Sequence, residues 1–475
     1  MTHSVLRDRL RSLYVLLLSY VAAAAGMLAA ALYLVFRLRL FVSTSTMLLG
    51  SLLLVYGPAL LSYTLSSGEQ YFLIRWLSGT AGEPHPIYSI IGATIGDIDP
   101  VIVAINLSVG LMYVCIIVGM ELINYLAPVR AVATDTALAH WSSQKLQGEL
   151  RDHRVLGMII LTLALFMLFV SWKENHLGTI SAYLSIDSGN ATRNLFRSYG
   201  GSPEYFYRVV LSAVAPIFVV WGAITAILRK SPFLLLSSYL LIVLTIVGDI
   251  QTLSKAPPAM FVLQLATAAI LIFTNRVSWK LLLCGALAVF VVVYASTNLM
   301  MIFHDAWTSA VAVYSRVFEA ENQSLFENFA TFPRVHPHMW GANIHAIALL
   351  MGEPYTPTYK IVARLWYGTD AVTSPSLFIA DAWAGFSYGG VILFSLVAGF
   401  VCRSLDLVFL VKGKSDLAIA VLSAALLGIF TLLTTALNTA LLSGGLLLAP
   451  VLARAVLAAD HLVSGKAHQQ SDQQG

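Results

Sequence analysis

The chain has 475 residues, of which 58% are hydrophobic and 11% are charged, and its formal net charge is +4. So few charges cannot keep a chain of this hydrophobicity in solution, which excludes a soluble globular protein. The positive charge is spread out without a dense basic run, so nucleic acid is not an expected partner. Cys115, Cys284 and Cys402 lie far apart within apolar segments and indicate neither a disulfide framework nor a metal cluster.

Apolar segments predict an all-α polytopic membrane protein, a bundle of about eleven transmembrane helices (10–12). A helix needs roughly 20 apolar residues to cross a hydrocarbon core of about 30 Å, and its backbone amides must be bonded within it. The first segment follows Arg7, Arg9 and Arg11 and runs on without a small-residue cleavage site, so we expect a retained anchor. The expected spans lie near residues 12–36, 45–65, 100–126, 154–172, 209–228, 232–249, 257–274, 279–296, 386–411, 417–436 and 439–457.

Short connections rich in Lys and Arg orient these helices, because such connections face the cytoplasm. Those at 229–230, 276–280 and 403–414 agree with one another and place the loops at 172–208 and 297–375 together on the outer face. With eleven spans, the N-terminal arginines would lie outside, against the charge rule. Either a further span lies between Ser66 and Asp99 or the N-terminus is an exception.

One membrane domain with outer loops accounts for the whole chain. We find neither an internal repeat nor an inverted pair of broken helices of the kind transporters show, which disfavours transport. The expected division is N-terminal transmembrane helices at 1–296 with an outer loop at 172–208, a large outer loop at 297–375, C-terminal transmembrane helices at 376–460, and a polar, disordered tail at 461–475.

The segment GDIDP places Asp97 and Asp99 directly before a span, on the expected outer face. In membrane glycosyltransferases with a polyprenyl-phosphate donor, an acidic residue in an early outer loop often serves acid–base or metal chemistry. Helix N-capping by Asp99 explains the same residues without such a role.

In the outer loop at 172–208, Arg193 and Arg197 lie four residues apart in a segment with helix-compatible composition. Two cations at this spacing repel, so an anion between them would be stabilising, and guanidinium groups bind phosphate bidentately. A lipid-linked diphosphate is a natural ligand at this depth. Alternatively, both arginines reach lipid headgroups or pair with Glu204 and Asp187.

Lys255 lies just before Pro257 and Pro258, at the expected start of a helix. A cation there opposes the positive end of the helix dipole, so an anion should compensate for it. Asp249 and a substrate phosphate are the two candidates.

The large outer loop contains an amphipathic helix candidate at 308–329, on which Tyr314, Arg316, Glu319 and Gln323 share a polar flank. This stretch is followed by the densest group of ionisable side chains in the chain.

That group reads FPRVHPHMWG and holds Arg334, His336, His338 and Trp340. A metal site needs three or more ligands and no supporting motif is present, so we expect no metal. An imidazole here could act as a general base towards a hydroxyl or bind a diphosphate oxygen. The alternative is a surface loop that caps the bilayer with Trp and His.

Asp381 enters an otherwise apolar helix beside Tyr388 and the Gly389–Gly390 pair. An acid at membrane depth costs at least roughly 2.5 kcal/mol on insertion scales, so we expect a partner for it, with Arg316 and Arg334 as candidates. The glycines suit a close helix approach.

The layout of spans, the K-x-P-P turn before a helix, the late outer loop ending in FPRVHPHMWG and the following D-x-W-x-G-F-x-Y-G-G helix resemble the O-antigen polymerase, or oligosaccharide repeat-unit polymerase, family over roughly residues 190–410. The resemblance implies that a growing glycan on undecaprenyl diphosphate is transferred onto a lipid-linked repeat unit at the periplasmic face of the bacterial inner membrane. A GT-C-like architecture is expected with it.

The resemblance also implies the partners and the residue roles. No cofactor is needed, because the diphosphate itself is the leaving group. The partners are the undecaprenyl-diphosphate-linked oligosaccharide, membrane lipid, and a flippase and a chain-length regulator of the same pathway. Arg193, Arg197 and Lys255 would bind the diphosphate, Arg316, Glu319, Arg334, His336 and His338 would be catalytic, and Tyr314, Trp340, Trp366, Arg364, Asp381 and Tyr388 would support the sugar or the structure.

Three alternatives stay open. An O-antigen ligase shares this layout and chemistry but transfers the glycan to the lipid A core. Another polyprenyl-phosphate-dependent glycosyltransferase would depend on Asp97 and Asp99. A transporter would instead line a path across the bilayer with polar residues.

Overall fold

The computed structural model describes residues 3–65, 97–185, 205–251, 256–276, 319–368 and 376–472, together with the single residues 287, 291 and 294. Over these residues the secondary structure is helical, apart from two isolated bridges that join Phe41 to Arg276 and Gln147 to Ser415. Eight of the described helices are long and apolar enough to cross a membrane. The protein is therefore an all-α polytopic membrane protein.

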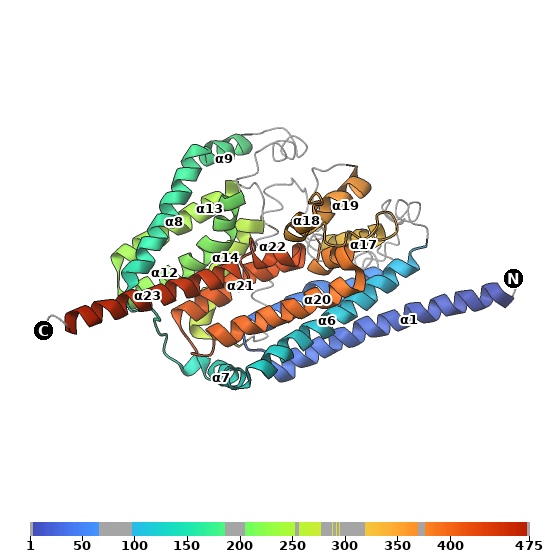
Figure 1. Cartoon of the computed structure of the whole chain (residues 1–475), viewed down its shortest axis with the longest axis horizontal. Helices are drawn as coiled ribbons and strands as arrows, with labels where there is room; N and C mark the ends of the chain where they lie inside the picture. Colours follow the sequence, from blue (N-terminus) through green and yellow to red (C-terminus); the bar gives the residue numbers. More distant parts are fainter. Residues whose placement is uncertain are drawn as a thin grey trace.

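Figure 1 shows the long helices packed as one bundle. The eight candidate spans are Ser12–Arg37, Thr44–Leu65, Asp99–Leu126, His153–Lys173, Tyr205–Arg229, Pro232–Gln251, Phe378–Phe409 and Asp416–Thr434. Their helices, in order, are α1 (His3–Leu32) with η1 (Tyr33–Arg37), α2 (Thr44–Tyr56) with α3 (Pro58–Leu65), α6 (Asp99–Leu126), α8 (His153–Lys173), α11 (Tyr205–Val209) with η3 (Val210–Val214) and α12 (Ala215–Arg229), α13 (Pro232–Gln251), α20 (Phe378–Phe409) and α21 (Asp416–Thr434).

Eight of the expected spans thus correspond to described helices, and α14 (Ala256–Phe273) is a shorter apolar helix at the expected position of a ninth. The expected span at 279–296 lies almost wholly outside the described residues. The one at 439–457 is not a continuous helix, because α22 (Leu437–Leu441) ends before α23 (Leu448–Asp472) begins. The helix expected from 386 begins earlier, at Phe378.

Three of the long helices, α1, α6 and α20, lie side by side and form one flank of the bundle (Figure 1). Glycines allow this close approach: a Cβ atom on Gly119 of α6 would lie 2.2 Å from the carbonyl oxygen of Leu396, and one on Gly399 of α20 would lie 2.1 Å from that of Ile116. Small residues at such crossings let helix backbones meet in a membrane, where dispersion and not hydrophobicity drives association.

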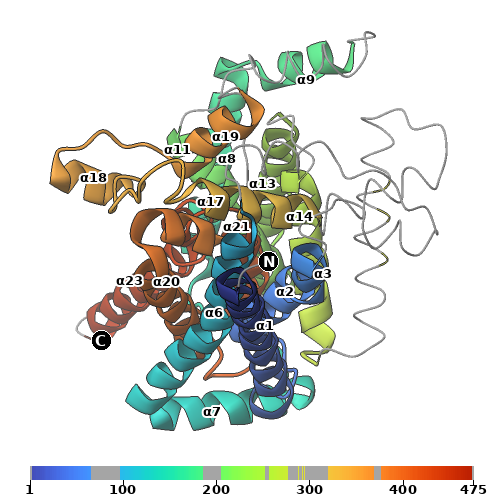
Figure 2. The same ribbon diagram turned by 90° about the vertical axis from the view of Figure 1, so that its right-hand side faces the viewer.

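Shorter helices lie across the two ends of the bundle (Figure 2). α7 (Pro128–Ala139) marks one end, which we call the basic end because the connections at 229–230, 274–276 and 410–415 meet there. The other end, which we call the site end, carries α9 (His176–Leu184), α17 (Ala320–Thr331), α18 (His345–Met351) and α19 (Thr358–Tyr367). A cytoplasmic basic end stays a prediction of the charge rule.

Contacts at the site end show at which end of the bundle the first helix, α1, begins. Tyr63 of α3 packs against Phe326 of α17 with ring centroids 6.3 Å apart, and Arg334 donates to the backbone carbonyl of Asp97 at 2.7 Å. Residues 65 and 97 therefore lie at the same end, and the residues between them lie outside the described part of the chain. Because α1 runs parallel to α6, it also begins at the site end, away from the basic end.

A buried polar network fixes the helices at the basic end. Arg403 is 1% exposed and donates to Asp135 at 2.8 Å and to Asn124 at 2.7 Å. Asp406, one turn along α20, is fully buried and accepts from the backbone amides of Thr44 and Ser45, at the start of α2. The network joins α2, α6, α7 and α20, so the rigid part of the scaffold holds α20 at the end away from the site.

Candidate functional site

The site end is organised around the first half of α20. Its backbone is interrupted at Phe386 (φ −140°, ψ 20°) and Ser387 (φ 55°, ψ −145°), which frees carbonyl groups that a regular helix would bond internally. The amides of Met339 and Trp340 donate to the carbonyls of Ala384 (2.8 Å) and Gly385 (2.9 Å). The FPRVHPHMWG loop thus supplies hydrogen-bond donors to the backbone carbonyls at the break. Irregular backbone within a membrane requires such partners.

Trp383 lies at the centre of an aromatic cluster beside this break. Its ring stacks on Phe329 of α17 at 4.7 Å, and its Nε1 donates to the carbonyl of Phe332 at 2.9 Å. Tyr388 meets it edge-on at 4.9 Å, and His338 does so at 5.5 Å. The cluster therefore joins the loop, α17 and both sides of the break.

The two histidines of the loop differ in their surroundings. His336 is half-buried and its Nδ1 lies 2.8 Å from the carbonyl of Pro337. His338 packs on Trp383 and Trp340, and its Nδ1 is buried without a hydrogen-bond partner among the described residues. A buried polar nitrogen without a partner costs free energy unless a ligand supplies one, which makes His338 the better candidate for chemistry.

Arg334 is exposed, and it donates to the backbone carbonyl of Asp97. This contact joins the FPRVHPHMWG loop to the GDIDP segment, which the sequence analysis considered as two separate candidate sites. The expectation that Asp99 caps its helix is wrong: Asp99 lies in the first turn of α6, and the carboxylate of Asp97 accepts from the amide of Asp99 at 3.2 Å. No group of three or more His, Cys, Asp or Glu side chains with metal-ligand spacing occurs among the described residues.

α17 is polar in composition and yet almost entirely buried. Of the four residues predicted to share a polar flank, Glu319 and Gln323 are each only 6% exposed, and Tyr314 and Arg316 lie outside the described residues. Buried polar groups must be bonded, and here Gln323 and Tyr367 of α19 both donate to Glu327 at 2.8 Å. The buried polar residues of this helix are Asn322, Gln323, Ser324, Glu327, Asn328 and Thr331.

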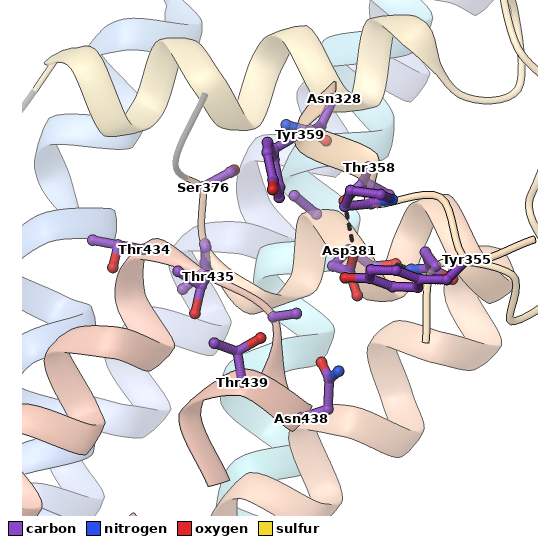
Figure 3. A pocket seen from close by; sticks show the side chains of 15 residues that line it. Asn328, Tyr355, Thr358, Tyr359, Ser376, Asp381, Thr434, Thr435, Asn438 and Thr439 are labelled. Carbon is purple, nitrogen blue, oxygen red and sulfur yellow. Dashed lines mark hydrogen bonds between the residues drawn. The ribbon is translucent and has the colours of Figure 1, made fainter. Parts of the chain in front are cut away.

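A pocket of about 300 Å³ opens where α17, α19, the start of α20 and the junction between α21 and α22 meet (Figure 3). α21 ends at Thr434, whose carbonyl accepts from the amide of Ser376, and Thr435 is extended (φ −150°, ψ −178°) before α22 begins. This second interruption directs polar side chains into the pocket. The labelled lining residues are Asn328, Tyr355, Thr358, Tyr359, Ser376, Asp381, Thr434, Thr435, Asn438 and Thr439.

Asp381 forms the buried wall of this pocket and is 8% exposed. One carboxylate oxygen accepts from the hydroxyl of Thr358 at 2.6 Å, and the other has no hydrogen-bond partner among the described residues. The expected pairing with Arg334 is therefore wrong, because that guanidinium is directed at Asp97. Arg316, the other expected partner, lies outside the described residues.

The electrostatic character of the pocket is acidic. In the described part of the chain, no Lys, Arg or His lines it. Burial, followed by the nearby charge of Asp381, raises the pKa of Tyr355, so this phenol stays protonated. The pocket can therefore donate through tyrosine hydroxyls and accept through a carboxylate, amides and threonine hydroxyls.

The structure brings together part of the predicted site. His338, Trp340 and Tyr388 gather beside the break in α20, with Asp381 in the same helix, and Arg334 and His336 lie on the same loop as His338. Trp366 of α19 lies against α17, where it donates to Thr331 at 3.0 Å, and Arg364 lies in the exposed last turn of α19. The remaining predicted residues, Arg193, Arg197, Lys255, Tyr314 and Arg316, lie outside the described residues.

The sequence-based site omitted most of the pocket lining. Thr358, Ser376, Thr434 and Asn438 were not candidates, although one signal points to the last two: polar residues at the end of a predicted span are functional candidates by default. Thr358 and Ser376 lie in or next to the segment that the sequence analysis assigned to the large outer loop. Only their tertiary contacts identify them as pocket residues.

Comparison of the chain with protein-family models, with curated proteins and with solved structures finds no match.

Proposed function

We propose that this protein is a glycosyltransferase that polymerises undecaprenyl-diphosphate-linked oligosaccharide repeat units into a surface polysaccharide at the periplasmic face of the bacterial inner membrane. The observation that supports it is the pocket at the site end, whose hydroxyl, amide and tyrosine lining suits a sugar. About eleven spans and a GT-C-like architecture belong to this proposal, as do the flippase and chain-length regulator as partners.

The chemistry follows from the donor. An acceptor hydroxyl attacks the anomeric carbon of the donor glycan, a new C–O bond forms, and the bond from that carbon to the diphosphate oxygen breaks. The electron pair leaves with undecaprenyl diphosphate, so no nucleotide or other cofactor is required. The protein must accept the hydroxyl proton and stabilise the charge of the leaving group.

Among the described residues, His338 and Arg334 fit these two tasks. The unpartnered Nδ1 of His338 can accept the hydroxyl proton, and the exposed guanidinium of Arg334 sits on the same loop to meet negative charge. Glu319 and His336 remain further candidates for the base. Arg316, Arg193, Arg197 and Lys255 keep their proposed charge-stabilising roles from sequence.

Two other transferase functions are alternatives for the same arrangement of helices and site residues. An O-antigen ligase would perform this chemistry with the lipid A core as acceptor. A polyprenyl-phosphate-sugar glycosyltransferase would use Asp97, whose carboxylate accepts from the amide of Asp99 and whose backbone carbonyl accepts from Arg334.

Transport is a second candidate, and one observation favours it. Two interrupted helices contribute to the pocket lining: α20 does so before its break at Phe386 and Ser387, and α21 to α22 do so at the interruption itself, Thr435. Interrupted helices often form transporter sites. Purified protein in liposomes with a fluorescent lipid-linked oligosaccharide separates the two functions. A transporter moves this lipid between leaflets without lengthening its glycan, whereas a polymerase lengthens it.

The decisive test is gel analysis of surface polysaccharide from cells that lack the protein. Wild type, Arg334→Ala and His338→Ala are returned in turn, and the membrane level of each is measured. We expect deletion to collapse a ladder to a single repeat unit, wild type to restore it, and the two variants to fail.

Lys360→Ala is the matched control, because Lys360 is an exposed cation on α19 at the same end but does not line the pocket. It should restore the ladder fully. An unchanged chain-length distribution in the deletion strain would refute polymerisation and make the Asp97 and Asp99 alternative the leading one.

A further inference from the structure

The pocket presents a surplus of hydrogen-bond acceptors. The hydroxyls of Thr434 and Thr435 donate to the carbonyls of Phe430 (3.1 Å) and Thr431 (2.9 Å) within their own helix, and the hydroxyl of Thr358 donates to Asp381. Because each hydroxyl has one proton, these three side chains can offer the pocket only lone pairs.

Three further oxygens of residues that line the pocket are buried and without a hydrogen-bond partner among the described residues. They belong to the Asp381 carboxylate, the Ser376 hydroxyl and the Asn438 amide, and Asp381 and Ser376 are each only 8% exposed. Figure 3 shows Asn438 pointing across the pocket towards Asp381. The oxygens of Asp381 and Asn438 are acceptors, whereas the Ser376 hydroxyl can both donate and accept. Buried acceptors left without donors cost free energy, so the two acceptors favour a ligand that donates hydrogen bonds.

Size and charge narrow that ligand. The pocket volume of about 300 Å³ is at the lower end of small-molecule sites and is roughly ten times the share of one water molecule, so a bare metal ion would leave it largely empty. A phosphate or carboxylate could accept from the hydroxyl and amide donors of the lining, but it would leave the buried acceptors without donors. It would also face the Asp381 charge with no basic residue in the described lining to offset that charge. Tyr355 and Tyr359 add aromatic surface of the kind that packs on sugar rings.

We propose that this pocket binds one uncharged sugar ring of the lipid-linked repeat unit through its hydroxyl groups, with Asp381 as the residue that selects neutral sugars and rejects acidic ones. The proposal rests on the function proposed above and assigns the diphosphate to the basic residues outside the pocket. Asp381 is a specificity residue in this role and not the general base, which is assigned to His338, a residue that packs on Trp383 and does not line the pocket.

The test measures binding alone, with the purified full-length protein in lipid nanodiscs and saturation-transfer NMR. The probes are the methyl glycosides of glucose, galactose, mannose and N-acetylglucosamine, the uronates of the first three, pyrophosphate, and methylammonium. We expect at least one neutral glycoside to bind, and to bind at least about tenfold more tightly than its uronate, a difference of about 1.4 kcal/mol.

Asp381→Asn keeps the side-chain shape and the bond from Thr358 but turns a donor towards the pocket. It should weaken neutral-glycoside binding about tenfold and narrow the ratio to the uronate. Asn438→Leu, which removes an acceptor from the far wall without touching a buried charge, should also weaken binding and covers the case in which the Asp381 variant does not fold. Lys360→Ala should bind as wild type does.

Equal or tighter binding of a uronate, binding of pyrophosphate displaced by a neutral glycoside, binding of methylammonium alone, or no glycoside binding at all would each overturn the proposal. The polymerase proposal is judged separately by the polysaccharide ladder. Glycoside binding with an unaltered ladder in deletion cells would refute polymerisation and leave the pocket assignment standing, whereas a lost ladder without glycoside binding would do the reverse.

Discussion

Asp406→Ala should destabilise the fold by about 3 kcal/mol without changing the activity of molecules that remain folded. The carboxylate is fully buried and accepts from the amides of Thr44 (2.7 Å) and Ser45 (3.1 Å) and from the hydroxyl of Ser45 (2.6 Å). Its removal leaves two buried amides without acceptors, at about 1–3 kcal/mol each. Part of this cost is offset because a buried charge is also removed.

The assay is SDS titration of the purified protein in mixed micelles, followed by tryptophan fluorescence. Asp406→Asn should fall between wild type and alanine, since its amide can accept through one oxygen only. Ser404→Ala is the matched control, because that hydroxyl bonds only to the carbonyl of Phe400 in its own helix, and the change should stay within about 0.5 kcal/mol. A loss below 1 kcal/mol for Asp406→Ala would refute the view that this carboxylate anchors α2 to α20.

Two further predictions concern histidines. His338→Gln should abolish chain lengthening in the ladder assay while His336→Gln retains most of it, because only the former carries a buried, unpartnered nitrogen; equal loss in both would remove the distinction. Burial lowers the pKa of His176, which is fully buried, despite the nearby carboxylate of Glu174. Its neutral form therefore stabilises the fold fully above the unfolded value of about 6.5, and this stability should be lost progressively as pH falls below that value. Thermal unfolding at pH 7.5 and 5.0 should show a smaller drop for His176→Gln than for wild type, and an identical drop would contradict the assignment.

The helices that cross the bundle could be predicted from sequence because membrane hydropathy acts over about 20 residues and needs no knowledge of neighbours. The start of α20 could not, since Asp381 and Gly385 lower the hydropathy of residues that nevertheless continue the helix. Asp381 is tolerated there because Thr358, 23 residues earlier, donates to it. This hydrogen bond comes from the first residue of α19, and local composition around Asp381 does not reveal such a tertiary contact.

The candidate site, like the helices, could be predicted from sequence only in part. The sequence singled out the FPRVHPHMWG loop and the D-x-W-x-G-F helix, and the structure packs these two segments together. The link is made by backbone amides of Met339 and Trp340, however, and not by the expected ion pair of Asp381 with an arginine. Side-chain types indicate which segments carry chemistry, but backbone pairing depends on where a helix breaks, and the break at Phe386 and Ser387 has no strong local signal.

Asp381 has no arginine partner among the described residues, and this leaves its carboxylate able to accept hydrogen bonds from a ligand. A carboxylate paired with a guanidinium would have its lone pairs occupied and could not receive hydroxyl groups from a sugar. Because Thr358 donates to only one oxygen, the other remains available to the pocket. Arg334 donates to the carbonyl of Asp97, His338 packs on Trp383, and neither residue lines the pocket. In the proposed transfer of a sugar from a diphosphate, the ring needs an acceptor-rich contact and the leaving group needs a cationic one, and these two requirements conflict within one pocket. The separation of Asp381 from the loop cations resolves this conflict, and an Asp381→Arg variant, which would merge the two environments, should lose glycoside binding while it gains affinity for pyrophosphate.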